Sequence, residues 1–379
     1  GFRCTNVSRF GLVIWHGLPL AAYGKLLAGN GCRVSWNRWD RAFAFGLSGT
    51  LNSALNLVDR WVFGQRVKNL QLDHAPIFII GHWRSGTTFL HELLVRDPRF
   101  TYPSTLDCFL PHHSLLSGWF FTTFGNFMLP KQRPQDNVPT GWFRPQEDEF
   151  ALLNLGIPSP YLRMAFPNRP AVDMEYLDSE QLSAADRESW LDGLEEFIRV
   201  VSCRDPGKPV VLKSPPHLGR IEALAERFPG ARFIHIIRDP YSVFPSTQRL
   251  WRSLDMVQGL QSPAHRDLDE YVLSCLEKMY AAFQRQRPNL PDGSICDLLY
   301  EDLVADPLGE VLRIYEQLGL GEIEPARRDL EQYVESQRDF KVNRHQLQEH
   351  DRLQVKNRWG EFFECYGYDL EAPLEDETA

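Results

Sequence analysis

The segment Gly81–Thr88, GHWRSGTT, has residue types and spacing that could bind a phosphate. Its two glycines are separated as in a P-loop, G-x-x-x-x-G, and the segment stands between an apolar, β-branched run and a run with helical spacing. Backbone N–H groups of such a loop surround an anion, and the N-terminus of the following helix adds positive potential. Thr87 occupies the place of the Lys that nucleoside triphosphatases direct at the β- and γ-phosphates. The pattern therefore favours a different phosphate ligand.

Two further segments carry cations where predicted strands end. In IIRDPYSVFPSTQRLW, Arg238 ends a strand and Ser246 follows two helical turns later, so the pair could hold a second phosphate. In VLKSPPHLGR, Lys213 and His217 stand at another strand end, and histidine is the residue type suited to general-base work near neutral pH. The alternatives are a surface Arg–Asp pair at Arg238 and an ordinary helix-start histidine at His217.

The segment PQEDEFALL offers acids as competing bases, with Glu147 the leading candidate beside Asp148 and Glu149. Three consecutive acids are alternatively a solvated helix start, where carboxylates suit the helix dipole. The only adjacent histidine pair, His112-His113, has no carboxylate nearby at metal-ligand spacing. We therefore expect no metal requirement.

These residues must be positioned by repeated strand–loop–helix units. Continuous apolar strands followed by helices predict an α/β fold, a three-layer sandwich around a parallel sheet with a P-loop-like nucleotide-binding core. Ser183 and Asp186 form a capping signal for a helix with one apolar stripe. The predicted strands cover 76–82, 209–213, 231–239 and 294–302.

Between the first two units lies an irregular, aromatic-rich insert at about 98–180. Residues 100–166 contain 13 aromatic side chains, about 19%, against 12% for the whole chain. Aromatic-rich pockets suit sugars, phenols, sterols and lipids alike. We expect this insert to bind the second substrate, whose identity the sequence leaves open.

The first 75 residues are predicted to form a helical extension preceding a domain over 76–379. Residues 1–70 hold nine Lys/Arg against two Asp, a net charge of +7, which leaves −16 for the rest of a chain whose total is −9. Such a basic, Trp-rich segment indicates contact with an anionic membrane surface, or alternatively helix packing on the acidic core or in a homodimer. The overall acidity excludes a general nucleic-acid binder. The longest uncharged runs of residues 1–70 are too short or too polar for a typical membrane span.

Seven Cys without a CxxC pair indicate reduced thiols, and hence a cytoplasmic protein, with membrane association on the cytoplasmic face as a further expectation.

Taken together, the motifs resemble the sulfotransferase superfamily, whose sulfuryl donor is 3′-phosphoadenosine 5′-phosphosulfate (PAPS). GHWRSGTTFL is similar to the family's 5′-phosphosulfate loop, in the RSGTT form of the bacterial-type branch. IIRDPYSVFPSTQRLW is similar to its 3′-phosphate segment, and DLLYEDLVADPLGEVL to a stretch after the fourth core strand. The closing R-K-G-x-x-G motif of the cytosolic branch is not recognisable, and Asn357-Arg358-Trp359-Gly360 matches it only faintly.

The resemblance implies roles residue by residue. Arg84 would contact the 5′-phosphate and the bridging oxygen, while Arg238 and Ser246 would bind the 3′-phosphate. Lys213 and His217 lie near the place of the family's K-T-H segment, so His217 would deprotonate an acceptor hydroxyl with Lys213 beside the sulfuryl group. The product would be 3′,5′-ADP. The residues expected to surround the 5′-phosphate are Ser85, Gly86, Thr87 and Thr88.

The implied activity is a PAPS-dependent sulfotransferase acting on a hydroxyl of a lipid, glycan or small molecule. Two alternatives remain at this stage: a P-loop kinase-like phosphotransferase, and a non-catalytic membrane-associated nucleotide-binding protein. Intact donor-loop residues argue against the second alternative, and the missing P-loop Lys argues against the first.

Overall fold

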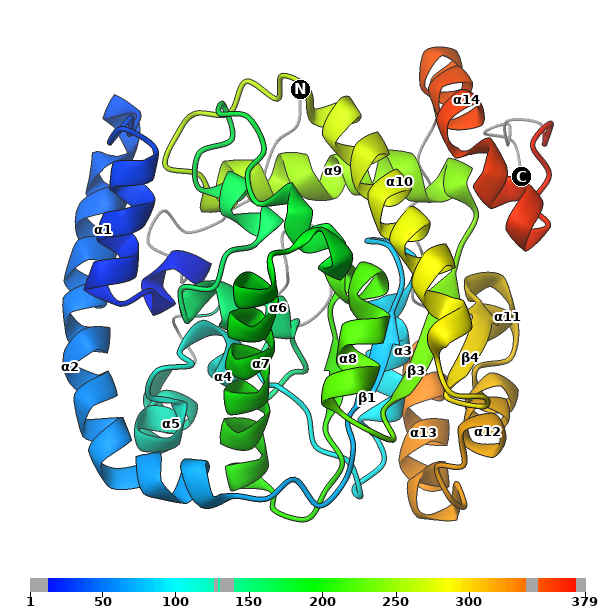
Figure 1. Ribbon diagram of the computed structural model, residues 1–379, viewed down its shortest axis with the longest axis horizontal. Coiled ribbons are helices and arrows are strands. Elements are labelled where there is room, and N and C mark those ends of the chain that lie inside the picture. The colour runs from blue at the N-terminus through cyan, green and yellow to red at the C-terminus, as the bar shows by residue number, and fades with distance from the viewer. Residues whose placement is uncertain (1–12, 126–128, 130–139, 339–346, 373–379) are drawn as a thin grey trace.

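A four-stranded parallel sheet forms the centre of the molecule (Figure 1). The computed structural model describes residues 13–125, 129, 140–338 and 347–372. The strands follow the order β2-β1-β3-β4, so the first strand along the chain lies in the interior of the sheet. All four predicted strands are confirmed: β1 (Ile77–Ile80), β2 (Val211–Lys213), β3 (Arg232–Ile237) and β4 (Ile295–Leu299).

Alternate residues of each strand enter two separate hydrophobic cores. Phe78 and Ile80 belong to one core, while Ile77 and Ile79 belong to the other. Both faces of the sheet are thus covered, and the predicted three-layer α/β fold is confirmed. The first face packs against α7 (Ala184–Arg204), α8 (Ile221–Arg227), α9 (Pro240–Gln258), α10 (Leu268–Gln286) and α14 (Glu349–Tyr366). The second packs against α3 (Thr87–Leu94), α12 (Pro307–Leu318) and α13 (Glu324–Ser336), while α11 (Tyr300–Ala305) follows β4.

The predicted cap of α7 is present, since the Ser183 hydroxyl accepts a hydrogen bond from the Asp186 amide at 3.1 Å. The expected apolar stripe of this helix, which includes Trp190, Leu194 and Phe197, is buried.

The aromatic insert folds into short helices joined by irregular chain. Its described residues contain isolated β-bridges but no regular strand. It contains α4 (Thr105–Phe109), α5 (Ser114–Phe124), α6 (Asp148–Asn154) and the 3-10 turns η4 (Pro160–Met164), η5 (Met174–Leu177) and η6 (Ser179–Gln181). Two further 3-10 turns, η7 (Pro215–Arg220) and η8 (Arg287–Asn289), belong to later connections.

The N-terminal segment is helical, as the sequence indicates, and shares a core with the sheet. Trp15, Tyr23 and Phe45 lie in the same hydrophobic cluster as Phe78. At Gly17 a Cβ atom would lie 1.9 Å from the carbonyl oxygen of Phe109, so the segment approaches the insert closely. The domain boundary at residue 75 stays a prediction. The elements are η1 (Ile14–Gly17), α1 (Leu20–Gly29), η2 (Trp36–Arg38) and α2 (Trp39–Asn69).

In the part of the chain that the structure describes, no helix has the length and apolarity needed to cross a bilayer.

Candidate active site

Three adjacent strands bring the predicted motifs to one edge of the sheet. Ile79 of β1 pairs with Lys213 of β2, and Ile80 pairs with His235 of β3, so the carboxyl ends of these strands are neighbours. The loop 81–86 therefore leaves β1 between Lys213 on one side and Arg238 on the other. Ligands of open α/β sheets bind at this edge.

The loop after β1 has a backbone that requires glycine. Gly86 has φ 103°, and a Cβ there would lie 2.3 Å from Cδ2 of Tyr300. At Gly81, a Cβ would lie 2.5 Å from the carbonyl oxygen of Ile236. Arg84 also has a positive φ, 69°, which is uncommon for a side chain of this size. The loop is thus held against β3 and Tyr300.

Ser85 closes this loop from inside, because its amide and its hydroxyl both donate to the carbonyl oxygen of His82, at 3.2 and 2.7 Å. Thr87 and Thr88 are the first two residues of α3, so their amides lie at the helix N-terminus, where anions are stabilised.

The 3′-phosphate candidates contact the loop directly. Arg84 Nε donates to the Ser246 hydroxyl at 2.9 Å, and Arg238 Nη1 donates to the Arg84 carbonyl at 3.0 Å. The Arg238 guanidinium also lies 4.2 Å from the centre of the Tyr300 ring, a cation–π distance. Asp239 fixes the start of α9 by accepting hydrogen bonds from two amides of its first turn. Two guanidinium groups and a hydroxyl from distant segments are thereby brought together.

Three acids at the start of α6 pair with three cationic or basic side chains around the end of β2. Their partners are Lys213 for Glu147 at 2.6 Å, His217 for Asp148 at 2.6 Å, and Arg220 for Glu149 at 2.8 Å. Asp148 and Glu149 are almost fully buried. The interpretation of this acidic run as a solvated helix start is therefore wrong for these two acids, which fasten the insert to the sheet.

Glu147 differs from its two neighbours in remaining partly exposed, with 16% of its side chain accessible. Its Oε2 accepts a hydrogen bond from the Tyr161 hydroxyl at 2.9 Å. The Tyr161 hydroxyl oxygen in turn accepts a hydrogen bond from Trp83 Nε1 at 2.6 Å. Burial, together with the charges of nearby glutamates, raises the pKa of Tyr161 well above its usual value, so the phenol remains a donor. Trp83 thus links the loop after β1 to an accessible carboxylate.

His217 is fully buried, between the rings of Phe78 and Trp190 and the carboxylate of Asp148. Although burial favours the protonated carboxyl, the charge and hydrogen bond of His217 lower the pKa of Asp148. A general base must come within hydrogen-bond reach of the proton that it removes. Burial and pairing therefore argue against His217 as the base and for a structural role in holding α6.

Several side chains of the site escaped the sequence prediction. Trp83 lies inside the predicted loop, so its position could have been suspected from the motif. Arg220 and Tyr300 lie inside motifs that the sequence singled out, but no role was assigned to them, although Tyr300 directly follows β4. Tyr161 gave no signal, because only the packing of the insert brings it to the sheet edge.

The remaining candidates lie in structural contacts. Arg358 pairs with Glu270 and Glu277 of α10, and the buried Trp359 packs against the His82 ring. The histidine pair contacts neighbouring residues: His112 Nε2 lies 2.8 Å from the Asn154 carbonyl oxygen. Among the described residues, no group of three or more His, Cys, Asp or Glu side chains is arranged to hold a metal ion.

A family model described as "Sulfotransferase family" matches residues 76–325. The chain belongs to the sulfotransferase family. A Mycobacterium bovis protein named omega-hydroxy-beta-dihydromenaquinone-9 sulfotransferase is 42% identical over 371 residues, which cover 98% of this chain and 95% of that protein. Mouse carbohydrate sulfotransferase 4 is 23% identical over 277 residues, 64% of this chain and 65% of that protein.

Solved structures share the fold. Sulfotransferase STF1 of Mycobacterium tuberculosis superimposes with a TM-score of 0.61 at 20% identity, covering 86% of this chain and 88% of that one. STF9 of Mycobacterium avium gives 0.62 at 17% identity, covering 97% and 100%. The chain is accordingly an enzyme that transfers a sulfuryl group to a hydroxyl, and the kinase and non-catalytic alternatives are set aside.

Proposed function

We propose that the enzyme transfers the sulfuryl group of PAPS to the hydroxyl of a lipid acceptor, of the hydroxylated isoprenoid quinone class. The observation that carries the proposal is the meeting, at one sheet edge, of a glycine-dependent anion loop, the Arg84–Ser246–Arg238 contacts and the accessible Glu147 carboxylate. The acceptor class rests on 42% identity along nearly the whole chain to a relative named for such a substrate.

The donor would bind across the loop. Amides of Thr87 and Thr88 and the guanidinium of Arg84 suit the 5′-phosphate, while Arg238 and Ser246 suit the 3′-phosphate. Gly86 keeps the loop close to Tyr300. Ser85 acts indirectly, by holding the turn through His82.

The general base in this proposal is Glu147 rather than His217. Its carboxylate would accept the acceptor's hydroxyl proton while the oxygen forms a bond to sulfur. The bond from sulfur to the bridging oxygen breaks, and that oxygen leaves with the electron pair as part of 3′,5′-ADP. Arg84 and Lys213 would stabilise the charge that develops on the bridging and sulfuryl oxygens. These roles need no metal. The absence of a metal requirement remains a prediction from the sequence.

The aromatic insert is the proposed acceptor site, because it carries both Glu147 and the Tyr161 that donates to it. Helix α6 begins directly after Glu147, and the following 3-10 turn, η4, contains Tyr161. Apolar and aromatic side chains suit a polyprenyl chain. We further propose that the enzyme meets this acceptor at a membrane surface on the cytoplasmic side.

The proposal is tested by incubating the full chain with PAPS and an ω-hydroxylated menaquinone, and detecting the sulfated product by mass spectrometry. A soluble phenol and a glycan acceptor serve as comparisons. Product from the quinone alone supports both donor and acceptor. Product only from the glycan or phenol would retain the donor and overturn the lipid class, whereas no binding of 3′,5′-ADP would overturn the donor assignment.

A further inference from the structure

Helix α2 carries an apolar stripe that faces away from the protein. Exposed fractions reach 76% at Phe43 and 85% at Trp61. At 100° per residue, the exposed positions fall within one arc of about 140° around the helix axis, which places them on one face. The stripe consists of Trp39, Phe43, Leu47, Leu51, Leu57, Val58, Trp61 and Val62.

The opposite face of the same helix is packed on the protein. Its buried positions Ala42, Phe45, Gly49 and Asn52 are offset from the stripe by about half a turn at 100° per residue. No charged residue occurs from residue 42 to 58. The helix runs along one outer edge of the molecule, far from α14 (Figure 1). It is therefore apolar on both sides, with only one side covered by the described chain.

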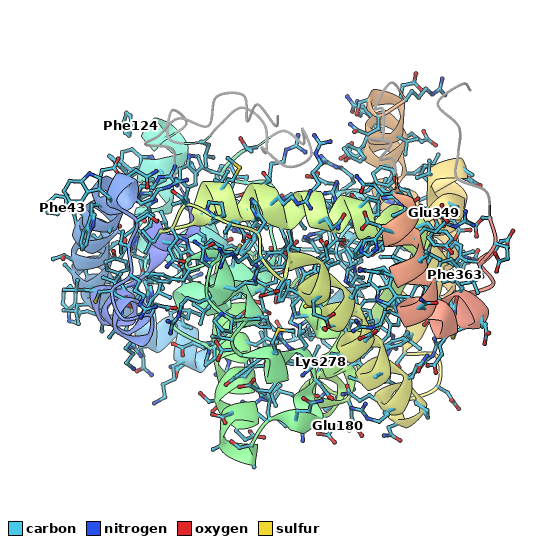
Figure 2. All side chains as sticks on the ribbon, turned by 90° about the horizontal axis from the view of Figure 1, so that it is seen from above. Phe43, Phe124, Glu180, Lys278, Glu349 and Phe363 are labelled. Atoms are coloured by element: carbon cyan, nitrogen blue, oxygen red, sulfur yellow. The ribbon has the colours of Figure 1, made fainter. Side chains whose placement is uncertain are left out.

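Helix α5 packs against the covered side of α2, through the buried Asp59, and carries further exposed aromatic residues. Its exposed aromatics are Trp119, Phe120 and Phe124, with Trp119 72% exposed. The Asp59 carboxylate of α2 accepts a hydrogen bond from the Leu116 amide of α5 at 2.9 Å, which fixes the two helices together. Figure 2 shows Phe43 and Phe124 at the same end of the molecule. We call the exposed apolar residues of α2 and α5 the apolar face.

The net charge of the segment that carries the stripe favours an anionic occupant. Residues 13–70 hold seven Lys/Arg against two Asp, a net charge of +5, in a chain with −9 overall. Two such basic segments would repel each other across a twofold interface, whereas an anionic lipid surface attracts them. Tryptophans lie toward both ends of α2 and on α5, and indole rings suit the headgroup level of a bilayer.

We propose that the apolar face docks the enzyme onto an anionic bilayer, with α2 lying parallel to the surface and its stripe inserted into the headgroup–acyl boundary. Helices with aromatic and aliphatic side chains on one face and cations nearby bind membranes in this way. Helix α2 is about 46 Å long along its axis at 1.5 Å per residue. Figure 1 shows its last turns bending away from the edge, so the contact would follow the straight part of the helix. The inference concerns a surface separate from the donor site and does not rest on the proposed acceptor.

The test is flotation of the full chain with vesicles of 70% phosphatidylcholine and 30% phosphatidylglycerol, against pure phosphatidylcholine. The stripe variant is Phe43→Ser/Leu47→Ser/Trp61→Ser. Its matched control, Val172→Ser/Val304→Ser/Leu353→Ser, changes exposed apolar residues outside the face. We expect the wild type and control to bind the anionic vesicles, more weakly at high salt, and the stripe variant to lose at least about tenfold in partitioning.

Stabilisation by 3′,5′-ADP reports folding in all three proteins independently of lipid. Failure of the wild type to bind, or equal binding by the stripe variant, would overturn the proposal. If the wild type is a dimer that does not bind vesicles, and the stripe variant is a monomer, the apolar face would instead be the contact with a second copy of the chain.

Should the triple variant not fold, the single change Trp61→Cys provides a second test. It is made in a Cys4→Ser/Cys32→Ser/Cys365→Ser background, because Cys32 and Cys365 are exposed and Cys4 lies outside the described residues. An environment-sensitive label at residue 61 should shift to the blue on anionic vesicles, and a label at Leu353→Cys should not. Equal shifts at the two positions would contradict a specific docking face.

Discussion

If the proposed donor assignment is correct, the wild type prefers nucleotides with a 3′-phosphate, and replacing Arg238 by alanine should remove that preference. The guanidinium lies over Tyr300 and donates to the Arg84 carbonyl, so it is held beside the loop before the donor arrives. A hydrogen bond to a charged group contributes about 1.5–3 kcal/mol. At 1.4 kcal/mol per factor of ten, 3′,5′-ADP should bind roughly 10–150-fold more weakly to the variant.

Calorimetric titration with 3′,5′-ADP and with 5′-ADP separates this effect from general damage to the loop. The wild type should prefer 3′,5′-ADP, and Arg238→Ala should bind both nucleotides alike. Ser246→Ala is the matched control, because it removes a hydroxyl partner but leaves the guanidinium, and it should retain part of the preference. If Arg238→Ala loses both ligands by the same factor, the residue supports the loop and our reasoning about the 3′-phosphate is incorrect.

Three further outcomes are expected. His217→Ala should lower the free energy of unfolding by about 3–5 kcal/mol, measured by urea denaturation, because it leaves Asp148 buried without its partner; a stable but inactive variant would restore His217 as a catalytic candidate. Gly86→Ala should abolish 3′,5′-ADP binding in the same titration, since its Cβ would meet the Tyr300 ring; unchanged affinity would show that the loop is adaptable. Burial raises the pKa of Asp255 to about 7 despite the nearby Arg163, so the folded protein holds this proton more tightly than the unfolded chain. The contribution of Asp255 to stability therefore falls as pH rises from about 4 to 7. The melting temperature of Asp255→Asn relative to that of the wild type should accordingly be higher at pH 8 than at pH 4, and a difference independent of pH would contradict the shift.

The sheet and the position of the glycine-dependent loop at 81–86 could be predicted because their signals are local. Short β-branched runs mark the strands, and the glycines at 81 and 86 are required by the loop's own backbone and its contact with Tyr300. The parallel order then places Lys213 and Arg238 on either side of the loop without any further information. Local pattern and tertiary structure agree here.

The roles of the basic and acidic residues could not be assigned in this way. Lys213, His217 and Arg220 all lie in one short segment at the end of β2, so their positions in the sequence do not distinguish their roles. Only the structure shows which acid each one pairs with, and that Glu147 is accessible while Asp148 and Glu149 are buried. Those pairs join residues more than 60 positions apart. Amphipathic spacing likewise did not reveal which face of α2 is covered, because both faces are apolar.

The most direct test of the account compares Glu147→Gln with the wild type in single-turnover sulfuryl transfer from PAPS to an ω-hydroxylated menaquinone. Loss of a general base costs roughly 10²–10⁴ in rate, whereas the amide preserves the shape of the side chain and one acceptor for Tyr161. We expect this loss in the rate of transfer, with 3′,5′-ADP affinity nearly unchanged. Transfer by Glu147→Gln at the wild-type rate would contradict the central claim that this carboxylate receives the acceptor's proton.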